Sequence, residues 1–137
     1  MKQDCIFCKI VNNELPYYKV YEDDLTLAFL DISPAAIGHT LVIPKEHFEN
    51  IFDIDKEVLK RIAEVSKLIA SKMESLEDVR GVNIFQSNGV AAEQVIMHYH
   101  MYIIPRRESD NFRINSCLKS LELEDNQFKD ILEKIRI

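Results

Sequence analysis

The sequence predicts a single α+β domain built on a mainly antiparallel sheet. Short strand-like runs lie on both sides of one long stretch with helical periodicity, in the order strands, helix, strands. Hydrophobic residues make up 47% of the 137 residues, which suits one core and argues against disorder. We therefore expect one domain over residues 1–137, with about five strands, one long helix and a short C-terminal helix.

The first half contains three expected strands. The run KVYEDDLTLAFLDI, residues 19–32, reads as two strands that turn at residues 22–24. The run HTLVIP, residues 39–44, predicts the third strand, and Pro44 ends it because proline cannot donate to a strand ladder.

A change of period marks the long helix. Val58, Ile62, Val65 and Ile69 recur at helical spacing, and Asp55 is a suitable N-cap, so we expect a helix from Asp55 to about Ser75. Further strands are expected over 81–87 and 95–107, a polar loop over 106–116, and a short helix within 121–137.

The run VIMHYHMYIIPRR, residues 95–107, places His98, His100 and Tyr102 on alternate positions. Successive strand side chains point to opposite faces, so these three share one face about 6.6 Å apart. A regular polar face of this kind predicts the wall of a cleft. The alternative is that both histidines are partly buried and hydrogen-bonded to the backbone.

Charge and composition exclude several classes of protein. The net charge is −6 and no basic stripe is present, so we expect no nucleic-acid partner. No apolar run is long enough to span a membrane and no signal peptide is evident, so we expect a cytoplasmic protein without a membrane partner. The three cysteines are then thiols or metal ligands rather than disulfides.

Three blocks of the chain resemble the histidine-triad (HIT) superfamily. HYHMYII, residues 98–104, resembles the histidine motif, and DISPAAIGHTLVIPKEH, residues 31–47, resembles a second hallmark block. CIFCKI and VYEDD resemble the N-terminal segment. The resemblance covers residues 4–107 and leaves 108–137 as a variable tail. It implies a HIT-like fold, in which the long helix packs across the five-stranded sheet and a short helix lies near each end. It points to the branch of hydrolases and transferases that cleave at the α-phosphate of a nucleotide.

The resemblance implies a role for each matching residue. His100 would attack the α-phosphorus and form a covalent nucleotidyl-histidine, with His39 near the phosphate and Tyr102 at the position of the third histidine. Asp31 would accept hydrogen bonds from the ribose hydroxyls, although it also suits a turn cap before Pro34. The remaining nucleotide-binding positions would be Ile6, Phe7, Ile10 and Leu30 around the base, with Ser87, Asn88 and Gln94 near the phosphate.

Some positions depart from the family pattern. Tyr102 cannot become a cation at neutral pH, Val95 replaces a common serine or threonine, and Glu93 adds negative charge. These departures leave two interpretations: an enzyme acting through His100, or a weak or inactive nucleotide-binding module. A third, catalytic zinc held by His98 and His100, ignores the block at 31–47.

The resemblance also implies a cofactor and partners. Some bacterial members bind structural zinc through residues that match Cys5, Cys8, His47 and His98, a complete Cys₂His₂ set. The alternative is a buried cysteine pair with a surface His47. The expected ligand is a purine nucleotide conjugate of the phosphoramidate, adenylated amine or dinucleotide type. Family members commonly form a homodimer through the long helix and a neighbouring strand.

Overall fold

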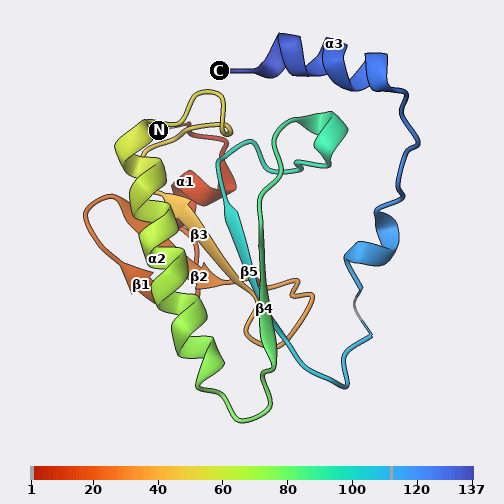
Figure 1. Cartoon of the computed structure of the whole chain (residues 1–137). Coiled ribbons are helices and arrows are strands. Elements are labelled where there is room, and N and C mark those ends of the chain that lie inside the picture. Colours follow the sequence, from red (N-terminus) through yellow and green to blue (C-terminus); the bar gives the residue numbers. More distant parts are fainter. Residues whose placement is uncertain (1, 112) are drawn as a thin grey trace.

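A computed structural model describes residues 2–111 and 113–137 as an antiparallel sheet with one long helix across it (Figure 1). The strands are β1 (Lys19–Glu22), β2 (Thr26–Leu30), β3 (Thr40–Pro44), β4 (Gly81–Phe85) and β5 (Met101–Arg106). The helices are α1 (Ile6–Val11), α2 (Lys56–Glu74) and α3 (Asp125–Ile135), with 3₁₀ turns at Val90–Ala92 and Asn115–Cys117. The strand order β1-β2-β3-β5-β4 confirms the predicted five-stranded α+β fold.

One aspartate shapes the turn between β1 and β2. The Asp23 carboxylate accepts hydrogen bonds from the backbone N–H groups of Leu25 and Thr26, at 2.9 and 2.7 Å, and from the Thr26 hydroxyl at 2.9 Å. A short acidic side chain suits a tight turn because it can satisfy the local backbone donors. The predicted reversal at residues 22–24 is therefore confirmed.

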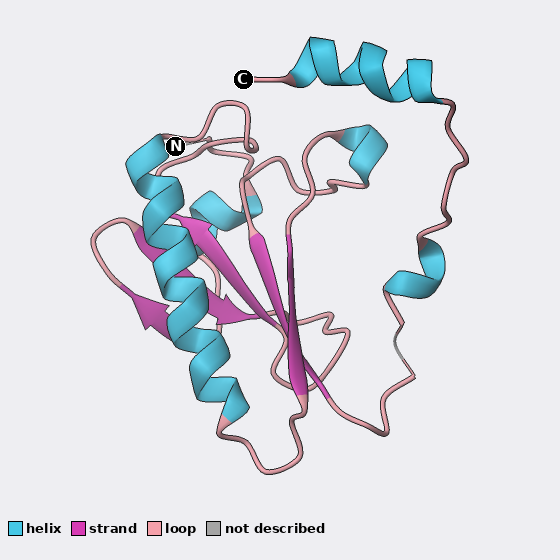
Figure 2. Ribbon diagram, viewed as in Figure 1, coloured by secondary structure: helices cyan, strands magenta, loops and turns pink. Residues whose placement is uncertain are grey.

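The long helix begins and ends where the sequence predicts. Asp55 is the N-cap and accepts from the backbone N–H groups of Glu57 and Val58, while Ser75 is the C-cap. The apolar face of α2 packs on the sheet (Figure 2). The buried residues of this main core are Ala28, Val42, Val58, Ile62, Val65, Ile69, Met73, Tyr99 and Ile103.

The fifth strand is shorter than predicted. It begins at Met101 rather than at residue 95, so Tyr102 is the one member of the polar trio that lies in the strand. Residues 96–98 bend, and the N–H of Tyr99 donates to the carbonyl of Phe48 at 2.7 Å instead of joining the β3 ladder. The side-chain alternation survives, because Tyr99 and Ile103 belong to the core beneath α2.

The other strand limits differ by one or two residues. β3 begins at Thr40 instead of His39, and β4 ends at Phe85 instead of Ser87. Gly38 precedes β3 with a φ of 98°, and a Cβ there would lie 3.2 Å from Cγ of Pro105. The turn that delivers His39 to the sheet therefore requires glycine.

The expected helices near both ends are present. Figure 1 shows α3 well away from the sheet at the end of a long arm, and its apolar side chains Phe128, Ile131, Leu132 and Ile135 are exposed. The predicted polar loop at 106–116 includes residue 112, which lies outside the described residues. No described helix has both the length and the hydropathy needed to cross a membrane. The division into a core at 4–107 and a variable tail at 108–137 stays a prediction.

Candidate functional site

A largely apolar cavity of about 510 Å³ opens on the face of the sheet opposite α2. The four side chains expected around a base, Ile6, Phe7, Ile10 and Leu30, all line it. Asp31, His100 and Tyr102 are its main polar groups. The complete lining is Ile6, Phe7, Ile10, Leu15, Pro16, Tyr17, Phe29, Leu30, Asp31, Ile32, Ser33, Leu41, Val95, Ile96, His100 and Tyr102.

His100 lines this cavity and has one unprotonated ring nitrogen. Its Nδ1–H donates to the carbonyl of His98 at 2.7 Å, so the lone pair is on Nε2. The Tyr102 hydroxyl lies 3.3 Å from Nε2 and donates a hydrogen bond to it. Burial lowers the pKa of His100, although the hydrogen bond to the His98 carbonyl and then the charge of Asp31 oppose this shift. The imidazole is therefore neutral at pH 7, which is the nucleophilic form.

Tyr102 stands between two other rings. It stacks on Phe85 with ring centroids 4.7 Å apart, and its centroid lies 5.2 Å from that of His39. Burial, and then the charge of Asp31, raise the pKa of the phenol above its ordinary value. Tyr102 is therefore a neutral donor held in one orientation.

His39 is buried directly behind this ring. Its Nδ1 accepts from the backbone N–H of Ala35 at 3.0 Å, so the ring proton is on Nε2. Nε2 is buried and has no hydrogen-bond partner among the described residues, and Asp31 Oδ2 lies 3.7 Å away. Burial lowers the pKa of His39. An unpaired buried N–H is costly unless it serves a ligand.

Asp31 combines the two roles considered for it. One oxygen, Oδ1, accepts from the backbone N–H of Ser33 at 2.8 Å and caps the turn. The other, Oδ2, faces His39, and the residue lines the cavity. The turn therefore holds the carboxylate at the cavity edge.

The structure does not bring His39, or the expected phosphate-loop residues Ser87, Asn88 and Gln94, into the cavity lining. The Gln94 amide accepts from the N–H of Gly89 at 2.8 Å and donates to the carbonyls of Glu49 and Ile96. Asn88 accepts from the N–H of Ile51 at 2.7 Å and exchanges two further hydrogen bonds with the amide of Gln86. These hydrogen bonds stabilise the loop that contains Asn88 and Gln94.

Several cavity residues were not anticipated from the sequence. Leu15, Pro16 and Tyr17 follow α1 and close one side, and Tyr17 meets Phe29 edge to face at 6.0 Å. Val95 and Ile96 line another part, whereas the exposed Glu93 does not, so its charge lies outside the lining. The one available signal was the apolar cluster of residues 15–17 directly after a polar turn.

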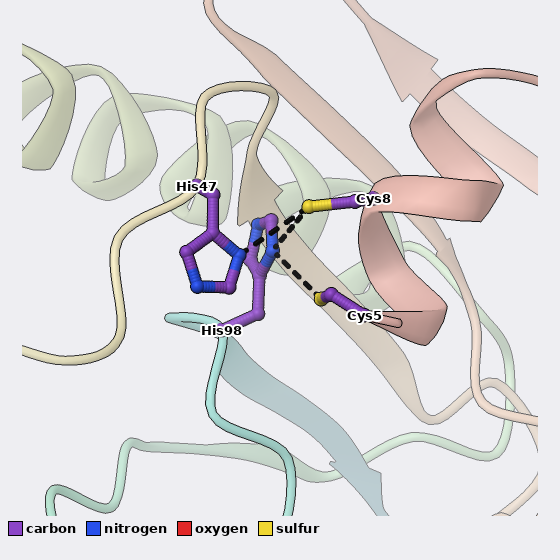
Figure 3. Close-up of side chains that lie close together, drawn as sticks. All are labelled: Cys5, Cys8, His47 and His98. Carbon is purple, nitrogen blue, oxygen red and sulfur yellow. Dashed lines mark hydrogen bonds between the residues drawn. The ribbon is translucent and has the colours of Figure 1, made fainter. Parts of the chain in front are cut away.

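A second cluster lies behind the cavity and contains Cys5, Cys8, His47 and His98 (Figure 3). Their potential ligand atoms all lie within 4.8 Å of one another. The Nδ1 atom of His98 is 3.5 Å from Cys5 Sγ and 3.6 Å from Cys8 Sγ, and Nδ1 of His47 is 3.3 Å from Cys8 Sγ. The structure therefore joins four residues from three distant segments.

The chemistry of this set suits zinc. The Nε2–H of His98 donates to the carbonyl of Pro44 at 2.8 Å, which leaves the Nδ1 lone pair facing the sulfurs. Burial lowers the pKa of His98 to about 4 and also lowers that of His47, so both rings are in the neutral form that binds metal. Two thiolates and two imidazoles make a closed tetrahedral zinc site, which supplies stability rather than an open catalytic position.

The two histidines of the 98–104 motif therefore belong to different sites. The His98 ring faces the cysteines, whereas the nitrogens of His100 meet a carbonyl and the Tyr102 hydroxyl. The metal cluster formed by the described residues does not include His100. The geometry does not support a catalytic metal shared by the two rings.

Comparison with known proteins identifies the family. A HIT domain is matched over residues 12–109. An uncharacterized HIT-like protein of Borreliella burgdorferi is 46% identical over 134 residues, 96% of each chain. Adenosine 5′-monophosphoramidase HNT1 of Saccharomyces cerevisiae is 40% identical over 104 residues, covering 76% of this chain and 63% of the yeast protein.

A solved structure is similar both in fold and in sequence. It is a zinc-bound histidine triad family protein from Mycobacterium smegmatis, with a TM-score of 0.76 and 39% identity over 81% of each chain. The family match spans well over half of this chain. The chain belongs to the HIT family.

Proposed function

We propose that the protein is a nucleotide hydrolase or nucleotidyl transferase that cleaves purine nucleotide conjugates at the α-phosphate through His100. The observation that carries the proposal is the geometry of that ring. Its Nδ1 proton is committed to the His98 carbonyl at 2.7 Å, and the residue lines the cavity. A fixed tautomer with one unprotonated nitrogen is what a covalent imidazole catalyst requires.

The lining suggests how the substrate lies. The apolar end formed by Ile6, Phe7 and Ile10 suits a purine ring. Oδ2 of Asp31 is available to the ribose hydroxyls because the turn uses Oδ1. With the base and ribose so placed, the α-phosphate would reach His100.

The proposed reaction has two displacement steps. Nε2 of His100 forms a bond to the α-phosphorus as the bond from phosphorus to the leaving group breaks. An amine leaving group departs with a proton, which the Tyr102 hydroxyl, 3.3 Å from Nε2, is placed to donate. Water then attacks phosphorus and breaks the P–Nε2 bond. The nucleotide is released, the electron pair of the P–Nε2 bond returns to Nε2, and a proton of the attacking water passes to the Tyr102 oxygen.

Neutral donors stabilise the phosphate in this scheme. The Nε2–H of His39 is buried, lacks a partner among the described residues and lies on the Asp31 side of the site. Donation to a phosphate oxygen would satisfy it. Zinc, when bound by Cys5, Cys8, His47 and His98, would supply structural stability behind the cavity.

A non-catalytic nucleotide-binding module is the second candidate. The observation that favours it is the absence of lysine and arginine from the described cavity lining. A phosphate there meets neutral donors alone, which stabilise a developing charge less than cations do. Turnover separates the two candidates, because both predict nucleotide binding.

We also propose that the protein is a cytoplasmic homodimer. β4 is an edge strand of the sheet, and Ile84 and Phe85 on it are 46% and 36% exposed. An unpaired edge beside a long helix suits pairing with a second copy.

The test compares the wild-type protein with His100→Asn. Hydrolysis of an adenosine phosphoramidate or adenylated lysine is expected to fall by at least about 10³-fold, while AMP binding and the circular dichroism spectrum are retained. Equal turnover by both proteins would refute the role of His100. Nucleotide binding without turnover in the wild type would select the binding module.

A further inference from the structure

The short helix α1 serves two sites at once. Cys8 within it and Cys5 directly before it face His98 in the metal cluster. Ile6, Phe7 and Ile10 of the same six-residue helix line the nucleotide cavity. Whatever fixes the cysteines therefore also fixes the apolar end of the cavity.

The helix cannot hold this position by itself. A helix of six residues is well below the length at which helices are stable alone in water. Its N-cap, Cys5, makes no side-chain capping hydrogen bond, and its first turn contains no acidic residue to favour the helix dipole. Tertiary contacts must anchor the start of α1, and the Cys5 side chain points into the metal cluster.

Phe7 connects this anchor to the catalytic ring. Its ring meets Phe29, His100 and His98 edge to face, with centroids 5.5, 5.3 and 5.8 Å away. Phe7 is 4% exposed, so a shift of α1 would have to displace it from a packed position.

The main core is formed by other residues than the metal cluster. None of the four ligand residues belongs to the cluster that packs α2 on the sheet. Phe7 and Ile10 belong instead to the second cluster, against which Cys5 packs. Loss of metal would therefore loosen α1 and the cavity while the sheet and α2 stay folded.

We propose that metal bound by Cys5, Cys8, His47 and His98 sets the affinity of the cavity for the base of its nucleotide by holding α1 in place. The inference rests on the proposed function and makes Cys5 and Cys8 positioning residues for nucleotide binding. Because coupling between two sites is reciprocal, bound nucleotide also tightens the hold on the metal.

The test measures ligand affinity of the full chain, purified without a histidine tag, before and after removal of zinc by a chelator. AMP and ribose 5-phosphate are the two probes, titrated by calorimetry or NMR. AMP affinity is expected to fall about tenfold without zinc and to recover when zinc is added back. Ribose 5-phosphate, which lacks the base and does not reach α1, is expected to bind equally in both states.

Matched variants repeat the test without a chelator. Cys5→Ser removes one ligand from outside the cavity lining, and Cys117→Ser removes an exposed cysteine from outside the metal cluster. The first is expected to bind zinc and AMP more weakly, and the second to behave as wild type. Competition with a chromogenic chelator at equilibrium gives a second readout. Saturating AMP is expected to raise the zinc affinity of the wild type about tenfold, and ribose 5-phosphate is expected to leave it unchanged. Global unfolding of the zinc-free protein would overturn the inference, because the sheet and α2 are expected to stay folded without metal.

The outcomes separate the inference from the proposed function. Equal AMP affinity with and without zinc would overturn the inference and leave the function standing. Equal weakening of AMP and ribose 5-phosphate would also overturn it, because general loosening would then be the cause. Failure of the zinc-loaded protein to bind AMP would overturn the proposed function and, with it, the inference.

Discussion

Replacing Tyr102 with phenylalanine removes one hydroxyl and leaves the rest of the ring in place. The ring would keep its stack on Phe85 at 4.7 Å and its contact with His39 at 5.2 Å. One hydrogen bond, to Nε2 of His100, is lost, and at 3.3 Å it is long. The free energy of unfolding should therefore change by no more than about 1 kcal/mol.

The effect on the reaction should be larger. A positioned donor to developing charge or to a leaving group contributes about 2.7–4 kcal/mol in well-studied sites. Tyr102 is neutral, since burial raises its pKa, and its hydrogen bond is long, so we place its contribution at about 1.4–2.7 kcal/mol. The expected fall in kcat is about 10-fold to 100-fold, with KM nearly unchanged.

The assay is steady-state hydrolysis of an adenosine phosphoramidate at neutral pH, with thermal unfolding measured in parallel. Tyr18→Phe is the matched control, because Tyr18 is 68% exposed and lies outside the cavity lining. An unchanged kcat in Tyr102→Phe would refute the donor role. A large drop in melting temperature would show that the hydroxyl supports the fold instead.

The remaining predictions concern pH, metal and stability. Burial lowers the pKa of His100, so kcat should fall only below the ordinary His pKa of 6.5, where the ring becomes protonated. Burial raises the pKa of Tyr102, so kcat should hold towards pH 10 while the phenol stays protonated. Loss of kcat above pH 6.5 on the acid side, or well below pH 10 on the alkaline side, would contradict this. Tag-free protein should contain about one equivalent of zinc by metal analysis, and less than about a tenth would refute the site. Ile62→Ala, at a fully buried position, should lower the free energy of unfolding by about 2–5 kcal/mol in denaturant titration, and a change below about 1 kcal/mol would contradict its place in the core. Asp55→Ala should cost about 1 kcal/mol through loss of two cap hydrogen bonds, and no change would show that the cap is dispensable.

The fold was largely predictable because its elements follow local rules. Asp55 caps α2, and the apolar period that follows it packs on the sheet, as the spacing of Val58, Ile62 and Val65 predicts. The reversal after β1 depends on one aspartate and its neighbours in sequence. Signals of this kind are short-range and can be read from the chain alone.

The extent of β5 could not be predicted from local rules. The alternation of His98, His100 and Tyr102 predicts a continuous strand, and successive side chains of this segment do point to opposite faces of the sheet. The N–H of Tyr99, however, donates to Phe48 rather than to β3, so the ladder begins only at Met101. Side-chain period reports burial, whereas strand length depends on which backbone groups a distant segment offers.

The candidate site could likewise be predicted only in part. The resemblance indicated the residues Cys5, Cys8, His47 and His98, and the structure brings them together. It could not indicate that Gln94 uses its amide on three backbone groups, nor that the segment at 15–17 closes the cavity. Those facts depend on tertiary packing, which spacing along the chain does not reveal.

The most direct test of the catalytic account is a mass measurement on rapidly quenched protein. The wild type is mixed with an adenosine phosphoramidate, digested and mapped by mass spectrometry. The account predicts one adenylyl group, acid-labile and located on His100, and none in His100→Asn. Turnover without any adduct on His100, or an adduct on another residue, would contradict it.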